Sequence, residues 1–312
     1  MIDINIISLR QNIYVIATYF SDVDLNLILL KDNDTGESIL LDSGTAELAP
    51  KIAELVGIPK SVYISHAHYD HAGGTEFFAK NGAKIYASRI TSLLLENETS
   101  AVESFFPSHY RGYFDPGYAE AFAQEIVRQS TIHLDTISIP TKSIKENKIK
   151  VLDAPGHVNG MQVYLIDNVL FSSDAIQGNG IKGTKTTNAI PQISSFNNYF
   201  HTVNYIIRLS PEIIVPGHNF GPANSRIIEG SKVDQFLHAS LETAQRILDY
   251  AYDALNEDWQ SLGSLTRYIL NKWNIDRLYP QALITTEAVI KHMIGDLCVI
   301  KEGNVILYKL CG

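Results

Sequence analysis

Four side chains that can bind a metal ion lie within six residues of one another, in the segment HAHYDH. They are His66, His68, Asp70 and His71. Imidazole nitrogens and carboxylate oxygens are ligands for zinc, iron and manganese. Crowding three imidazoles and a carboxylate together gives no structural benefit unless a cation holds them. The segment therefore predicts a metal site.

The residues on either side of this segment indicate how it is positioned. Val62, Tyr63 and Ile64 form an apolar run that is typical of a buried strand, and the run ends at Ser65. Two histidines that are two residues apart in an extended segment can point the same way. Gly73 and Gly74 allow the backbone to bend into a helix that begins near Thr75. The metal site is thus expected at the end of a buried strand.

A strand followed by HxHxDH resembles the metallo-β-lactamase superfamily of metal-dependent hydrolases. The resemblance implies three further ligands in order, and His157, Asp174 and His218 each follow an apolar run. It implies two divalent metal ions, with zinc expected and iron or manganese compatible with the same ligands. The first ion would be held by His66, His68 and His157. The second would be held by Asp70, His71 and His218, and Asp174 would bridge the two.

The same resemblance implies a mechanism. Water on such metal ions has its pKa lowered from about 15.7 to near 7, so hydroxide can attack an acyl carbonyl or a phosphodiester at neutral pH. Asp70 and Asp174 would be the catalytic carboxylates among the ligands. Asp42 ends an earlier strand and is similar to an acid that orients the metal-binding segment, although Asp-Ser-Gly is also ordinary turn chemistry.

The resemblance covers about residues 1–225 and implies an α/β fold, the four-layer αββα sandwich. Apolar and alternating runs predict strands over the first sixty residues, and residues 48–56 and 195–208 have the spacing of amphipathic helices. We assign residues 1–230 to a metal-hydrolase domain. Residues 231–312, three helical stretches and a terminal hairpin, are assigned to a winged-helix-like C-terminal region, which would pack on the domain or form a homodimer.

An aromatic insertion at residues 91–130 interrupts the core pattern. It could be a lid over the site, or a satellite hydrophobic cluster or dimer contact. If it is a lid, its candidate substrate-binding residues are His109, Tyr110, Arg111 and Tyr113. Lys182 and Lys185, in a glycine-rich loop, could contact an anionic substrate or be solvated loop residues.

Several substrate classes remain open, because ligands define a reaction type better than a substrate. A glyoxalase II-like thioesterase matches the ligand set, but no clear cluster of Arg and Lys that would grip a glutathione tail follows residue 225. A lactonase or carboxylic ester hydrolase suits an aromatic lid, although Gln177 stands where homoserine-lactone hydrolases usually have tyrosine. A ribonuclease or phosphodiesterase, and a regulatory or partner-binding protein with residual activity, are the alternatives.

Composition limits the class of protein further. The chain has 312 residues, 45% hydrophobic content and a formal net charge of −9, which disfavours broad nucleic-acid or anionic-membrane binding and favours a small-molecule substrate. No apolar run approaches the roughly 20 residues of a membrane span, and the N-terminus is not typical of a signal peptide. Two late cysteines, Cys298 and Cys311, cannot make a disulfide framework. We therefore expect a cytoplasmic protein.

Overall fold

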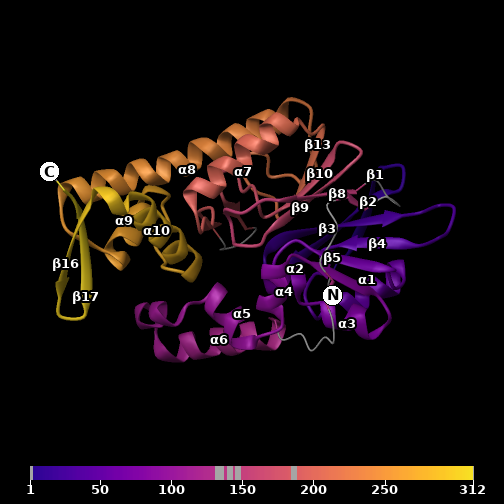
Figure 1. Cartoon of the computed structure of the whole chain (residues 1–312), viewed down its shortest axis with the longest axis horizontal. Coiled ribbons are helices and arrows are strands. Elements are labelled where there is room, and N and C mark those ends of the chain that lie inside the picture. The colour runs from indigo at the N-terminus through magenta and orange to yellow at the C-terminus, as the bar shows by residue number, and fades with distance from the viewer. Residues whose placement is uncertain (1–2, 131–136, 139–142, 145–148, 184–187, 312) are drawn as a thin grey trace.

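Two six-stranded sheets face each other between layers of helices (Figure 1). The computed structural model describes residues 3–130, 137–138, 143–144, 149–183 and 188–311. In the first sheet the strands follow chain order: β1 (Asn5–Arg10), β2 (Ile13–Phe20), β3 (Val23–Lys31), β4 (Ser38–Leu41), β5 (Ser61–Ile64) and β6 (Lys84–Ala87). The first four pair antiparallel, whereas β4, β5 and β6 are parallel.

The second sheet has the order β14-β13-β10-β9-β8-β7. Its strands are β7 (Ser143–Ile144), β8 (Ile149–Asp153), β9 (Gln162–Ile166), β10 (Val169–Ser173), β13 (Ile213–Pro216) and β14 (Ile228–Glu229). Strands β10 and β13 are parallel, so the residues that follow them emerge at the same edge. A small pair, β11 (Ile181–Lys182) and β12 (Asn188–Ala189), lies outside this sheet.

Both faces of each sheet are buried, because strand residues alternate between two hydrophobic clusters. Inward-facing residues such as Ile28 and Tyr164 form the core between the sheets. Leu27 and Leu29 face the opposite way, toward helices α1 (Ala49–Val56), α3 (Thr75–Lys80) and α4 (Arg89–Leu95). Val163 of the second sheet packs toward α7 (Phe196–Leu209) and α8 (Ser231–Glu257). The four-layer αββα arrangement expected from the sequence is therefore confirmed.

The C-terminal region consists of helices and a three-stranded sheet of order β15-β17-β16. Its elements after α8 are β15 (Gln260–Ser261), α9 (Leu262–Lys272), α10 (Pro280–Met293), the 3₁₀ turn η3 (Ile294–Asp296), β16 (Leu297–Glu302) and β17 (Val305–Leu310). The buried residues of α8, α9 and α10 belong to the same hydrophobic cluster as β9, β10 and α7. The region thus shares a core with the second sheet. The domain boundary at residue 230 stays a prediction.

Cys298 and Cys311 form a disulfide that joins β16 to the residue after β17. One bridge is not a framework, but disulfides persist mainly in oxidising compartments. The cytoplasmic location stays a prediction, and this bridge does not favour it. Across the described ranges, no helix combines the length and the apolar character that crossing a bilayer requires.

The aromatic insertion folds into helices α5 (Glu98–Phe105) and α6 (Pro116–Ser130), joined by the 3₁₀ helix η1 (Ser108–Tyr113). In Figure 1 these helices lie below α10 and to the right of the C-terminal hairpin. Tyr110 is fully buried, and its hydroxyl donates to the carboxylate of Glu287 on α10. The insertion is thus attached to the C-terminal region. The segment TIHLDTISI at residues 131–139, whose alternating pattern predicts a strand, falls almost wholly outside the described residues.

The Tyr110→Phe variant should be less stable than the parent by about 1–2 kcal/mol. It removes the hydroxyl that donates a hydrogen bond to the half-buried carboxylate of Glu287. Thermal and urea unfolding would measure the loss. Tyr252→Phe, at an exposed position of α8, is the matched control. A Tyr110→Phe variant with parental stability but altered substrate kinetics would contradict this structural role.

Candidate metal centre

The segment 66–71 lies directly after β5, and its four candidate ligands are all buried. His68 occupies extended backbone, and a single helical turn, α2 (Tyr69–Ala72), carries Asp70 and His71. The extended portion and the turn together aim all four side chains into one space, as the spacing predicts.

The other three candidate ligands come from the second sheet. His157 follows β8, Asp174 follows β10 and His218 follows β13. The glycines before the two histidines are required by packing. Gly156 has a φ of 141°, and a Cβ there would lie 2.6 Å from Cα of Tyr199. A Cβ on Gly217 would lie 2.7 Å from Cε1 of His71, inside the site itself.

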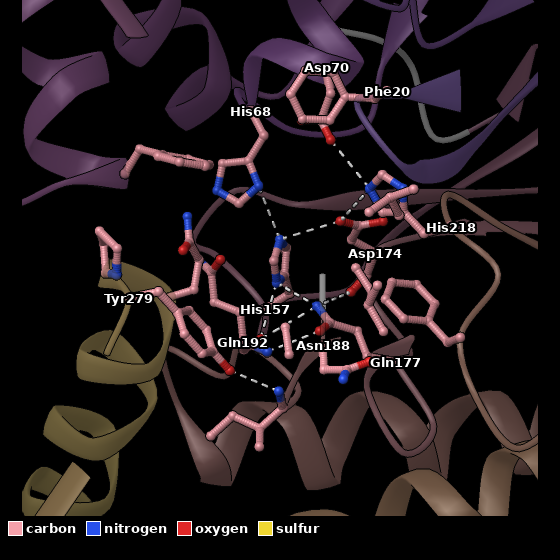
Figure 2. Close-up of a pocket in the computed structure, with 18 of the residues that line it drawn as sticks. Phe20, His68, Asp70, His157, Asp174, Gln177, Asn188, Gln192, His218 and Tyr279 are labelled. Atoms are coloured by element: carbon pink, nitrogen blue, oxygen red, sulfur yellow. Dashed lines mark hydrogen bonds and ion pairs between the residues drawn. The ribbon is translucent and has the colours of Figure 1, made fainter. Parts of the chain in front are cut away.

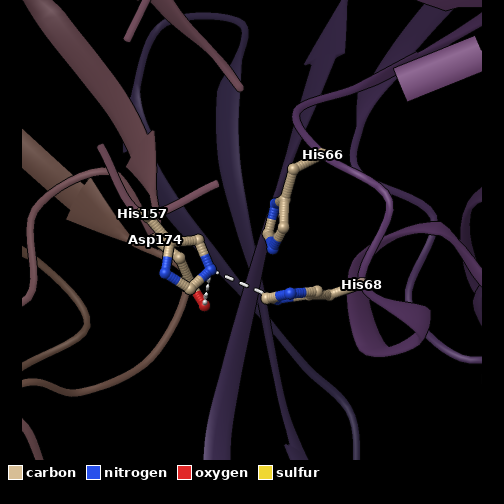
Figure 3. A group of neighbouring side chains, drawn as sticks. All are labelled: His66, His68, His157 and Asp174. Carbon is tan, nitrogen blue, oxygen red and sulfur yellow. Dashed lines mark hydrogen bonds and ion pairs between the residues drawn. The ribbon is translucent and has the colours of Figure 1, made fainter. Parts of the chain in front are cut away.

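These seven side chains form two buried groups. The first group is His66, His68, His157 and Asp174, and the second is Asp70, His71 and His218. Figure 3 shows the first group, with two histidines from the first half of the chain facing His157 and Asp174 from the second. Within each group one ligand atom per residue lies within 4.8 Å of the others.

Asp174 lies between the two groups. One carboxylate oxygen, Oδ2, is 3.8 Å from Nε2 of His157 and 3.6 Å from Nε2 of His218. The other, Oδ1, is 3.6 Å from Nε2 of His71. A carboxylate in that position could be shared by two cations, and the bridging role expected for Asp174 stays a prediction.

The hydrogen bonds around the second group fit a bound cation. Nδ1 of His71 donates to Asp42, and Nδ1 of His218 donates to the carbonyl of Asp24, at 2.8 and 2.6 Å. Each neutral ring then has an unprotonated Nε2, and these two nitrogens face each other at 3.3 Å. Two lone pairs at that distance repel unless a proton or a cation lies between them.

The first group fits a cation as well. Nε2 of His66 and Oδ1 of Asp174 are buried with no hydrogen-bond partner among the described residues. Nδ1 of His157 donates to the carbonyl of Gln192 at 3.0 Å, so its Nε2 presents a lone pair toward Nδ1 of His68, 3.2 Å away. Unpaired buried polar atoms are costly and therefore rare. The two groups thus fit a dinuclear metal site.

Asp42 is the anchor of this arrangement, and the orienting role expected for it agrees with its contacts. Its carboxylate accepts from the backbone N–H and the hydroxyl of Ser65, at 2.7 and 2.9 Å. It also accepts from Ser173, at the end of β10, and from His71. Asp42 itself has a φ of 61°, a left-handed conformation that aims its side chain at the site. One carboxylate thus joins both sheets to a ligand.

The protonation of the histidines differs between the two groups. Burial and neighbouring imidazoles lower the pKa of His66 well below its usual value, and burial lowers that of His68 to about 3. Burial also acts to lower the pKa of His71, but the carboxylates of Asp174 and Asp70 outweigh it, so the pKa of His71 is raised. The pKa of His218 is raised in the same way. The histidines of the first group are therefore neutral at pH 7, whereas those of the second attract a proton.

A cavity of about 270 Å³ opens onto the two groups (Figure 2). His68, Asp70, His157, Asp174 and His218 form one side of it. Much of the remaining wall is aromatic or aliphatic, and includes Phe20, Val23, Phe105, Tyr118, Phe122, Ile181, Ile190 and Phe220. Tyr279, Pro280 and Gln281, at the start of α10 and just before it, close the cavity from the C-terminal region. The arrangement can hold a small, largely apolar molecule against the ligand groups.

Only part of the expected lid faces this cavity. Phe105, Tyr118 and Phe122 line it, and the ring of Phe105 lies 4.6 Å from that of His68. Phe106 and Tyr110 do not line it but are buried in a hydrophobic cluster that joins Phe105 to Leu283 of α10. The insertion is therefore both a wall of the cavity and a satellite cluster.

Of the substrate-binding residues named from the sequence, the described ones do not line this cavity, and their role stays a prediction. Tyr110 is buried against Glu287, and His109 lies 3.7 Å from the same carboxylate. Arg111 is near Glu103, and Tyr113 contacts Gly263 of α9. These four residues contact α5, α9 and α10 because they belong to η1, which follows Phe105, the last residue of α5 and the one that lines the cavity. Lys182 is exposed and does not line the cavity, and Lys185 lies outside the described residues.

Sequence reasoning missed most of the cavity wall. Phe20 and Val23 flank the turn between β2 and β3, and Arg277 and Tyr279 precede α10. No motif marks these positions, because each lines the cavity only through long-range packing. Gln192, after β12, is another such residue. The turn between Phe20 and Val23 is Ser21-Asp22, an ordinary polar turn, so it gave no signal either.

Comparison with known families agrees with this geometry. The family model described as the metallo-beta-lactamase superfamily matches residues 23–218, more than half of the chain. The chain belongs to the metallo-beta-lactamase superfamily. The matched range begins at β3 and ends at the last candidate ligand, His218, so it contains all seven.

Two curated relatives are similar over about half of the chain. The anti-Pycsar protein Apyc1 of Bacillus phage 010DV004 is 28% identical over 171 residues, which are 50% of this chain and 65% of that protein. A hydroxyacylglutathione hydrolase of Methylobacillus flagellatus is 28% identical over 148 residues, 46% of this chain and 45% of that protein. The similarity thus spans less than two thirds of either relative.

Solved structures of the superfamily match nearly the whole chain. A metallo-beta-lactamase family protein from Thermus thermophilus has a TM-score of 0.69 at 17% identity, covering 97% of this chain and 100% of that one. A beta-lactamase domain protein from Burkholderia ambifaria has a TM-score of 0.74 at 15% identity, covering 98% and 94%. This similarity shows the fold, the C-terminal region included.

Replacing Asp42 with Asn should weaken metal binding by about 10–100-fold while the sheets stay folded, because the anchor of His71 loses its charge. Competition with a chromophoric chelator would measure the affinity, and far-UV circular dichroism the fold. Asp253→Asn, on an exposed part of α8, is the matched control. Unchanged affinity in Asp42→Asn would contradict the anchoring role.

Acidification should release metal from the second group before the first. The raised pKa values of His71 and His218 mean that protons compete there at higher pH than at His66 and His68, whose pKa values are lowered. Dialysis between pH 8 and pH 5.5, followed by elemental analysis, should show bound metal falling from about two ions per chain to about one. Loss of both ions together would contradict the difference between the groups.

Proposed function

We propose that this chain is a metal-dependent hydrolase that cleaves an acyl bond, either a thioester or a carboxylic ester or lactone. The observation that carries the proposal is the pair of buried ligand groups at one side of a largely apolar cavity. Members of the superfamily are typically hydrolases, and open ligand groups beside a cavity are what metal-assisted hydrolysis needs.

The chemistry divides between the metal ions and the protein. A pair of divalent cations in this site would supply a nucleophile at neutral pH by lowering the pKa of water to about 7, and would polarise an acyl oxygen. The protein holds the ligand atoms in place through Asp42 and through the carbonyls that accept from His157 and His218. Zinc is the proposed metal, since imidazole and carboxylate are among its usual ligands.

Two carboxylates keep their negative charge in the buried site. Burial would raise the pKa of Asp70, but His71 and His218 outweigh it, and the pKa falls to about 2. The pKa of Asp174 is lowered well below its usual value, since His218 and His71 again outweigh burial. Both side chains can therefore balance the charge of bound cations and accept a hydrogen bond from the attacking water.

The cavity wall supports an acyl substrate. Aromatic and aliphatic side chains exclude bulk water around the ligand groups and can pack against an acyl chain. A thioesterase related to glyoxalase II agrees with the partial similarity to a hydroxyacylglutathione hydrolase. Of the described residues that line the cavity, Arg277 is the one Lys or Arg, whereas a site for RNA would bring several cations to the phosphates.

A hydrolysis screen tests the proposal. Metal-loaded protein would be assayed on thioesters, carboxylic esters, lactones, phosphodiesters and RNA. We expect turnover of acyl substrates well above that of the phosphodiesters. Preferred cleavage of phosphodiesters would replace the proposal with a phosphodiesterase, and bound metal without hydrolysis of any substrate would favour a regulatory or partner-binding protein.

The His66→Ala and Asp174→Ala variants should lose bound metal and reduce acyl hydrolysis to background while the strands stay folded. Each removes a ligand whose unpaired atom faces the site. Elemental analysis, turnover and circular dichroism would be measured on the same samples. Exposed His238→Ala, on α8, is the control for loss of an imidazole. Full turnover and metal content in either ligand variant would contradict the assignment.

A further inference from the structure

Gln192 lines the cavity, and its side-chain amide nitrogen has no hydrogen-bond partner among the described residues. This nitrogen, Nε2, is buried, and only 6% of the residue's surface is exposed. Gln192 lines the same cavity as the ligand groups. A buried donor that no protein group accepts from costs free energy, and natural structures keep few of them. The wall of the cavity therefore contains a donor that has no acceptor among the described residues.

The backbone of Gln192 is fixed by the metal-binding loops. Its carbonyl accepts from Nδ1 of His157 at 3.0 Å, and its N–H donates to Oε1 of Gln177 at 2.9 Å. Nε2 of Gln177 in turn donates to the carbonyl of Asp174 at 3.0 Å. Figure 2 shows Gln177 and Gln192 beside His157 in this network. The main chain of Gln192 is thus connected to two candidate ligands, directly to His157 and through Gln177 to Asp174. These hydrogen bonds do not use the side-chain amide of Gln192.

We propose that Gln192 is a specificity-determining residue, whose side-chain amide donates a hydrogen bond to an uncharged oxygen in the acyl part of the substrate. This inference rests on the proposed acyl-hydrolase function. The anchor to His157 places Gln192 beside the first ligand group, where the acyl carbon must lie during attack. An amide donor is neutral, so it selects a carbonyl, ether or hydroxyl oxygen and has no charge to pair with an anion.

Substrates of this class are acyl compounds with an oxygen close to the carbonyl that is attacked. A cavity built around a donor discriminates strongly against an analogue that lacks the acceptor, because the donor is then buried without a partner. An aliphatic acyl chain of equal length would fill the same apolar walls but leave the amide of Gln192 unpaired. A water molecule that merely occupies the cavity would satisfy the amide equally with both substrates.

The experiment compares two acyl groups that differ by one atom. Methoxyacetyl and butanoyl esters of the same alcohol have equal length, and an ether oxygen in the first replaces a methylene in the second. The ratio of kcat/KM for the two esters would be measured for the parent and for Gln192→Met, which keeps length and removes the donor. We expect Gln192→Met to lower the ratio about tenfold or more, which corresponds to loss of one hydrogen bond.

Using a ratio removes the difference in intrinsic reactivity between the two esters, since it is the same for every variant. Metal content, measured by elemental analysis, should be unchanged in Gln192→Met because the hydrogen bond to His157 is made by the backbone carbonyl of Gln192. Gln245→Met, on exposed α8, controls for the substitution and should keep the parental ratio.

An unchanged ratio in Gln192→Met would overturn the inference and leave the proposed function standing. Loss of metal would also overturn it, because the side chain would then serve the ligand loops. If the parent hydrolysed no acyl substrate, neither these esters nor a thioester or lactone, the proposed function would fail instead. Calorimetric binding of methoxyacetamide and butanamide to the metal-loaded parent and to Gln192→Met would then still test the donor, and equal affinities in all four combinations would reject it.

Discussion

The carboxylate of Asp42 is the interaction on which the site depends. It accepts hydrogen bonds from the loop after β5, from His71 and from Ser173 at the end of β10. Because these donors come from both sheets, one buried charge fixes the distance between the two halves of the ligand set. A buried carboxylate is stable only when its acceptor sites are filled, so the alignment of the sheets and the charge of Asp42 depend on each other.

This dependence explains why the ligand atoms approach so closely in the folded protein. The lone pairs of His71 and His218 face each other at 3.3 Å because each ring is held from behind, by Asp42 and by the carbonyl of Asp24. Without a proton or a cation between them these two lone pairs repel each other, and the hydrogen bonds around the site keep the rings in place. A cation turns that repulsion into attraction, so metal binding and the stability of this edge of the sheets are linked.

The ligand set and the layered fold could be predicted from the sequence, whereas the cavity could not. His66, His68, Asp70 and His71 are close in sequence, and His157, Asp174 and His218 each follow an apolar strand, so their positions depend on local patterns. The cavity wall combines the β2–β3 turn, the insertion and the residues before α10, which meet only through tertiary packing. Tyr110 shows the limit. Its aromatic context suggested a lid, but its hydroxyl pairs with Glu287, 177 residues away in sequence.

The predictable residues are the candidate metal ligands on the core strands, and the unpredictable ones are the cavity-lining residues on peripheral segments. The core strands hold the groups that activate water, and their geometry tolerates little change, as Gly217 shows by leaving no room for a Cβ beside His71. The other residues that line the cavity belong to peripheral segments that pack over the same edge of the sheets. Phe105 comes from the insertion, Tyr279 from the C-terminal region and Gln192 from the segment after β12. Changes in those segments can alter the substrate without moving a ligand, so the reaction type follows from the core and the substrate from its surroundings.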